Sequence, residues 1–155
     1  MKILLAIDGS VPSLQAARWA LDLTGQGLSA DFVLVNVQEP ASLYEVVTAH
    51  DAEVIDQVRG AAGADLLREA EALLDAAGIG YESEVAGGTP EHLIVELAEN
   101  YGCDLIVMGA RGAGDPEAGG LGSVAQGVLD IATLPVTVVR RNGDSALPAA
   151  DTATP

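Results

Sequence analysis

Cysteine, lysine and long apolar segments are scarce in this sequence, and each scarcity excludes a class of protein. The one cysteine among 155 residues, Cys103, has no partner for an internal disulfide. Its place before an apolar run indicates a buried structural thiol rather than a nucleophile. No apolar stretch approaches the roughly 20 residues that span a bilayer, and Met1 and Lys2 lead into an expected strand without a signal-peptide pattern. We therefore expect a cytoplasmic protein with no membrane partner.

Positive charge is also scarce. The chain has 23 acidic residues against 7 basic ones, a formal net charge of −16, and Lys2 is its single lysine. Because nucleic-acid binding depends on Lys and Arg that neutralise phosphates, we expect no nucleic-acid partner. The acidic residues are spread along the expected helices, as in a highly solvated surface or a salt-adapted protein.

Residues suited to catalysis or metal binding are few. The two histidines, His50 and His92, fall in an expected loop and in the first turn of an expected helix, where surface roles are common. The sequence has no Cys/His cluster with metal spacing, no Gly-x-Ser-x-Gly elbow and no Gly-Lys-Ser/Thr end of a P-loop. We therefore predict no catalytic residue and no metal ligand.

The sequence does contain a regular alternation of apolar strand patterns and amphipathic helix patterns. We predict five strands, at residues 3–7, 32–37, 81–85, 104–108 and 135–139. We predict four helices between them, beginning at Ser10, at about Glu53, at Thr89 and, after Ser123, at Val124. The second helix is expected to end at Gly78. Its buried stripe is expected to contain Val54, Val58, Leu66, Leu73 and Ala77.

Five strands separated by helices predict a single α/β domain, a doubly wound parallel sheet with helices on both faces. The element count fits the strand orders 3-2-1-4-5 and 2-1-3-4-5, and both place a ligand at the carboxyl ends of the strands. Asp8, Val37 and Gly109 stand at such ends. We expect the domain to cover residues 1–141 and the Pro- and Ala-containing residues 142–155 to form a disordered tail.

A glycine-rich segment follows the fourth expected strand and precedes the fourth expected helix. Its spacing is Gly109-x2-Gly112-x9-Gly122-Ser123. Backbone N–H groups at a helix start bind anions such as phosphate, and glycines keep side chains away from a bound group. Ser123 either caps the helix or donates its hydroxyl to a phosphate. The segment favours a phosphate site, and a flexible surface loop before an ordinary capped helix is the alternative.

These motifs, together with Ala-Ile-Asp-Gly-Ser from Ala6 and Leu-Pro-Val-Thr-Val-Val from Leu134, resemble the universal stress protein family over residues 1–141. The glycine spacing is the mark of the ATP-binding branch of that family. The resemblance implies a Rossmann-like fold of the adenine nucleotide alpha hydrolase-like type, with five parallel strands in the order 3-2-1-4-5.

The resemblance also implies where ATP would lie. Asp8 and Val37 would lie against adenine and ribose, with Ala6 nearby. Val37 offers an apolar face to a base, and Asp8 accepts hydrogen bonds from ribose hydroxyls or the adenine amine. The ribose and phosphates would be surrounded by the remaining site residues: Met108, Gly109, Gly112, Gly122, Ser123 and Val124. For Asp8 the alternative is a turn and helix-cap carboxylate.

The function that follows is an ATP-binding sensor or regulator of the stress response. Because no P-loop lysine is present, ATP hydrolysis is expected to be slow at most. ATP would bind alone or with Mg²⁺, and Asp115 and Glu117 would weaken binding of a triphosphate unless Mg²⁺ bridges them.

The alternative function is a nucleotide-free homodimer that acts through protein contacts. Val136 and Val138 leave an apolar strand at the edge of the sheet, which must be covered or paired. The resemblance implies that this strand pairs antiparallel with its copy across a two-fold axis.

Two other protein classes share the architecture. A phosphorelay receiver needs an acidic pair after strand 1, an acceptor Asp after strand 3 and a Lys after strand 5. This chain has Asp8-Gly9, Ala86-Gly87 and Arg140 at those places. A flavodoxin needs a Ser/Thr-rich phosphate loop after strand 1, where the chain reads Asp-Gly-Ser-Val-Pro from Asp8. Neither class fits the sequence.

Overall fold

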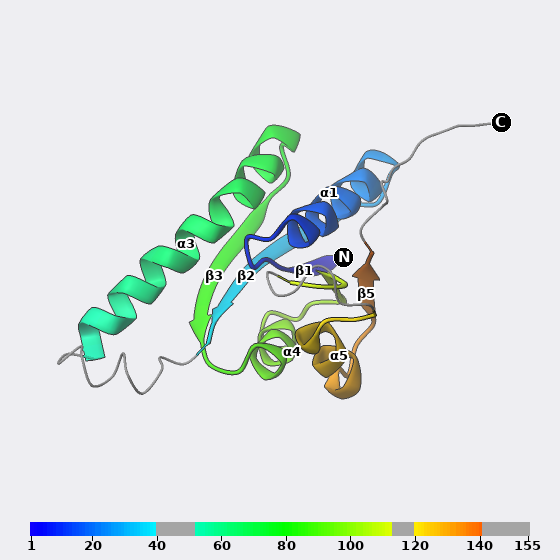
Figure 1. Cartoon of the computed structure of the whole chain (residues 1–155). Helices are drawn as coiled ribbons and strands as arrows, with labels where there is room; N and C mark the ends of the chain where they lie inside the picture. The colour runs from blue at the N-terminus through cyan, green and yellow to red at the C-terminus, as the bar shows by residue number, and fades with distance from the viewer. Residues whose placement is uncertain (40–51, 113–119, 141–155) are drawn as a thin grey trace.

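A parallel sheet with the strand order β3-β2-β1-β4-β5 forms the centre of the molecule (Figure 1). The computed structural model describes residues 1–39, 52–112 and 120–140. Within these ranges the strands are β1 Lys2–Ala6, β2 Asp31–Gln38, β3 Tyr81–Gly87, β4 Leu105–Gly109 and β5 Val136–Val139. The order implied by the family resemblance is confirmed, and the order 2-1-3-4-5 is excluded.

Four helices cover the two faces of this sheet in the described part of the chain (Figure 1). They are α1 Val11–Gly25, α3 Ala52–Ala77, α4 Pro90–Asn100 and α5 Ser123–Ile131. Leu14 of α1 and Leu67 of α3 pack with Ile3 and Leu5 on one face, whereas the other face joins Leu4 to α4 and α5. Alternate residues of β1 therefore enter opposite cores, as expected for a strand buried on both faces.

The ends of the helices follow the capping residues in the sequence. Ser10 is the N-cap of α1, with Pro12 in the first turn, and Thr89 is the N-cap of α4. Gly78, with φ of +69°, follows the last residue of α3, a backbone conformation that glycine adopts readily. These three boundaries agree with the sequence prediction.

The predicted buried stripe of α3 is wrong at Val58, which is 63% exposed, and at Ala77, which is exposed as well. Leu66 and Leu73 are half-buried, and the side chain of Val54 lies outside the described residues. The buried apolar side chains in the described part of the helix are Leu67, Ala70 and Leu74. The reason lies in Gly63, where a Cβ atom would come within 2.4 Å of Val85 Cγ1. The helix rests on β3 through this glycine, and that contact sets the rotation of α3 on the sheet.

Side-chain contacts surround the N-terminal end of β1, at the end of the sheet opposite the cleft. The Lys2 N–H donates to Asp104 Oδ2 at 2.9 Å, and Lys2 Nζ lies 3.4 Å from Glu82 Oε1. The Tyr101 hydroxyl donates to Glu84, and this hydrogen bond raises the pKa of Tyr101 to about 12. The chain's single lysine is thus engaged at the end of β1 opposite Asp8.

Several predictions fall on residues that the structure does not describe. They concern the tail at 142–155, His50, and the acidic pair Asp115 and Glu117. No helix in the described ranges is long and apolar enough to cross a membrane.

Candidate functional site

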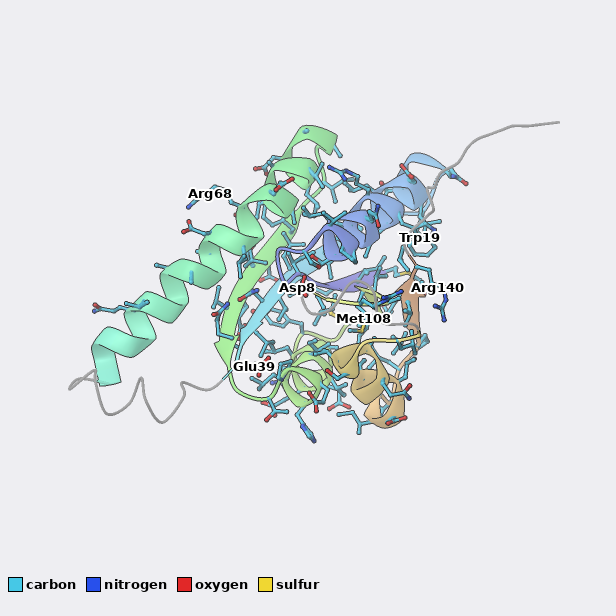
Figure 2. The ribbon with its side chains drawn as sticks, in the orientation of Figure 1. Asp8, Trp19, Glu39, Arg68, Met108 and Arg140 are labelled. Carbon is cyan, nitrogen blue, oxygen red and sulfur yellow. The ribbon has the colours of Figure 1, made fainter. Side chains whose placement is uncertain are left out.

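A cleft of about 560 Å³ opens where β1, β2 and β4 end. Figure 2 labels three of its residues, Asp8, Glu39 and Met108, which come from three different strand ends. All nine residues that the sequence predicted for the site line this cleft: Ala6, Asp8, Val37, Met108, Gly109, Gly112, Gly122, Ser123 and Val124. Segments far apart in the sequence therefore meet at one place.

Asp8 sits in the turn between β1 and α1, and its two carboxylate oxygens face different neighbours. Oδ1 accepts a hydrogen bond from the Ser10 N–H at 2.9 Å and another from the Ser10 hydroxyl. Oδ2 lies against Gly112, where a Cβ atom would come within 2.5 Å of it. Asp8 therefore acts as a turn carboxylate, as the alternative interpretation expected, and this role uses Oδ1. Its other oxygen, Oδ2, lies against the backbone of Gly112, which lines the cleft.

The glycines of the motif are required by close packing. A Cβ atom at Gly109 would lie 3.0 Å from the Pro12 carbonyl oxygen, and one at Gly122 would lie 3.3 Å from Arg111 Cα. The Gly122 N–H also donates to the Ala110 carbonyl at 2.8 Å. Because side chains at these positions would push the two loops apart, the walls here are made largely of backbone.

The N-terminus of α5 lies at the cleft and has no side-chain cap. Gly122 is its N-cap, and this residue has no side chain that could accept a hydrogen bond from the first N–H groups of the helix. Of the two roles that the sequence left open for Ser123, the helix cap is excluded, because Gly122 is the N-cap and Ser123 is the first residue of α5. The exposed Ser123 side chain lines the cleft. The first N–H groups of a helix have no partner within it, so this end attracts an anion.

Part of the lining of the cleft is an apolar wall. Val35 and Val37 come from β2, Met108 from β4, and Ile94 from α4. Val35, Ile94 and Met108 are buried, and Val37 packs against the same core. A flat apolar group fits such a wall, whereas the Asp8 carboxylate accepts hydrogen bonds from hydroxyl or amino groups.

The sequence analysis did not assign several lining residues to the site: Ile7, Ser13, Val35, Glu39, Pro90, Ile94, Arg111, Leu121 and Ala125. Glu39 follows Val37 by two residues, which is a strand period that could have identified it. Pro90 and Ile94 belong to the first turns of α4, and nothing local in the sequence relates them to the glycine motif. The titratable side chains among the described lining residues are Asp8, Glu39 and Arg111.

Other reactive groups lie away from this cleft. Cys103 is half-buried, and burial raises the pKa of its thiol, which disfavours the nucleophilic thiolate. His92 is exposed on α4. In the described ranges no group of three or more His, Cys, Asp or Glu side chains could hold a metal ion, and the expectation that the protein has no metal site stays a prediction.

Comparisons with known proteins identify the family. Residues 1–140 match the model of the universal stress protein family. The chain is 31% identical over 140 residues to universal stress protein MJ0531 of Methanocaldococcus jannaschii, and the match covers 90% of this chain and 82% of that protein.

Two solved structures share the fold. The structure of protein MJ0577 of M. jannaschii has a TM-score of 0.76 and 25% identity, and the match covers 91% of this chain and 96% of that one. A universal stress protein solved in complex with cAMP has a TM-score of 0.66 and 26% identity, with 90% of this chain and 96% of that one covered.

Proposed function

The chain belongs to the universal stress protein family, and we propose that it is an ATP-binding sensor or regulatory protein of the stress response. The observation that carries this proposal is the meeting of three features around one cleft: the apolar wall, the Asp8 carboxylate and the uncapped start of α5. A relative of the same fold was solved with an adenine nucleotide, cAMP.

The proposed arrangement of ATP follows the chemistry of the walls. Adenine packs against Val37 and Met108, and the hydroxyls of ribose or the adenine amine donate to Asp8. The phosphates approach the N–H groups of Ser123 and Val124, with the Ser123 hydroxyl beside them. Mg²⁺, where it accompanies ATP, would neutralise part of the phosphate charge.

We propose a sensor rather than a dedicated enzyme. Phosphoryl transfer depends on cations that stabilise the transferring group, and Arg111 is the one basic side chain among the described residues that line the cleft. Lys2 lies at the other end of β1. Hydrolysis of ATP is therefore expected to be slow at most.

A second proposal concerns the edge strand β5. In the described structure β5 pairs with β4 on one side, and its residues remain half-exposed. Val136 and Val138 belong to the core that α4 and α5 cover. We propose that β5 pairs antiparallel with its copy in a homodimer, since an apolar edge favours pairing. Light scattering at micromolar concentration should give the dimer mass, and a monomer mass would contradict this.

The direct test of nucleotide binding is to denature freshly purified protein and identify any released nucleotide by chromatography. We expect ATP in the supernatant, and heat on titration of stripped protein with Mg-ATP in a calorimeter. If neither is seen, the nucleotide-free homodimer becomes the better description. The expected cytoplasmic location stays a prediction.

A further inference from the structure

The charges that line the cleft do not match a triphosphate. Among its described lining residues, Asp8 and Glu39 are acidic and Arg111 is basic. The whole chain carries a formal charge of −16, so the field around the cleft adds to the local imbalance. Sites that bind several phosphates usually place Lys or Arg against them. The chain's single lysine, Lys2, pairs with Glu82 at the other end of the strands.

The groups that do attract an anion have a limited capacity. The start of α5 acts as roughly half a positive charge, and Arg111, which is itself engaged within the protein, adds at most one. Together they match at most the charge of a single phosphate group. Metal-free ATP carries two further phosphoryl groups, each with negative charge, which enter the same field without a matching cation.

We infer that this cleft selects its nucleotide by phosphate charge, accepting AMP or Mg-complexed ATP in preference to metal-free ATP. The inference rests on the proposed function, because it assumes that an adenine nucleotide occupies the cleft. Glu39 is assigned as a selecting residue. It is exposed and lies at the end of β2 (Figure 2), and its carboxylate lines the same cleft and repels phosphates bound there.

The direction in which salt changes the affinity for metal-free ATP distinguishes this selection from an ordinary phosphate site. At a phosphate site built from lysines and arginines, salt weakens binding because it screens attraction. Here the dominant interaction for metal-free ATP is repulsion. Raising NaCl from about 50 mM to about 500 mM shortens the Debye length and should therefore tighten binding of metal-free ATP.

The experiment is calorimetry on the full-length chain, stripped of nucleotide, with four probes: adenosine, AMP, ATP with EDTA, and Mg-ATP. At low salt we expect AMP and Mg-ATP to bind about tenfold or more tightly than metal-free ATP, and high salt should narrow the gap. Metal-free ATP that binds as tightly as AMP, or that weakens with salt, would overturn the inference and leave the proposed function intact. No binding of any of the four probes would overturn both.

A pair of variants separates the charge of the cleft from the charge of the chain. Glu39→Gln should tighten metal-free ATP by about threefold at low salt and leave adenosine unchanged. Glu69→Gln removes the same charge from an exposed position on α3 and should change the affinity less. Equal effects of the two variants, or an unchanged affinity for ATP in Glu39→Gln, would overturn the assignment of Glu39.

Discussion

The starts of helices α1 and α5 differ although they occupy equivalent places. Each follows a central strand, β1 or β4, and these strands are paired neighbours in the sheet. At α1 the Ser10 hydroxyl accepts from the Ser13 N–H at 3.3 Å, and Asp8 in turn accepts from Ser10. At α5 the cap is Gly122, with no side-chain hydrogen bond. The first helix start is capped by its own side chains, whereas the second has no side-chain cap.

The largest effect on ATP binding is expected when a carboxylate is placed at the uncapped start of α5. Gly122→Asp should lower ATP affinity by about 100-fold or more, because like charges at close range cost several kcal/mol. Titration calorimetry with Mg-ATP measures the effect. The same substitution at Gly25, which has open space around it, should leave the affinity unchanged.

Adenosine binding and circular dichroism show whether Gly122→Asp still folds, since adenosine carries no phosphate. A folded Gly122→Asp protein that retains its ATP affinity would mean that the phosphates lie elsewhere.

A smaller effect is expected when the side-chain cap at the start of α1 is removed. Ser10→Ala removes the cap of α1 and should lower the free energy of unfolding by about 1 kcal/mol, measured by urea denaturation. Ser29→Ala, at an exposed loop position, is the control and should change stability by less than about 0.5 kcal/mol. An unchanged stability in Ser10→Ala would show that the hydrogen bond from Ser13 contributes nothing to α1.

The smallest effect on stability and ATP affinity is expected from a substitution at the uncapped start of α5. Ser123→Ala should leave the free energy of unfolding within about 0.5 kcal/mol of the wild-type value, because Ser123 does not cap α5. Its ATP affinity should fall by about threefold through loss of one hydrogen bond, with adenosine unaffected. A stability loss equal to that of Ser10→Ala would indicate that Ser123 caps α5 in solution.

The sheet could be predicted because burial on both faces leaves an apolar run in the sequence. Leu105 to Met108 forms such a run, and it is buried in β4 except at its first residue. The ends of the strands were predicted less accurately, because pairing with neighbouring strands determines where a strand ends. β3 continues to Gly87 since this residue pairs with Gln38 of β2, and nothing in the local pattern of β3 indicates that.

Three residues of the cleft could be predicted from their position at a strand end: Asp8, Val37 and Gly109. The other predicted residues were those that the family resemblance implied. Ile94 could not be predicted in this way, since it enters the cleft only because α4 packs beside α5. The role of Ser123 was left open for a related reason. The N-cap of α5 is Gly122, and local sequence alone allows either residue at that position.

The contact between Gly63 and the sheet bears on which sequences this fold tolerates. A Cβ atom there would meet Val85 Cγ1 at 2.4 Å and Asn36 Oδ1 at 2.9 Å, and Asn36 is buried and donates to the Ile7 carbonyl just before Asp8. In a saturation library of α3, exposed positions such as Val58 should accept most residues. Position 63 should accept glycine alone, which makes it the least variable position of a helix that has no residue among the described lining of the cleft.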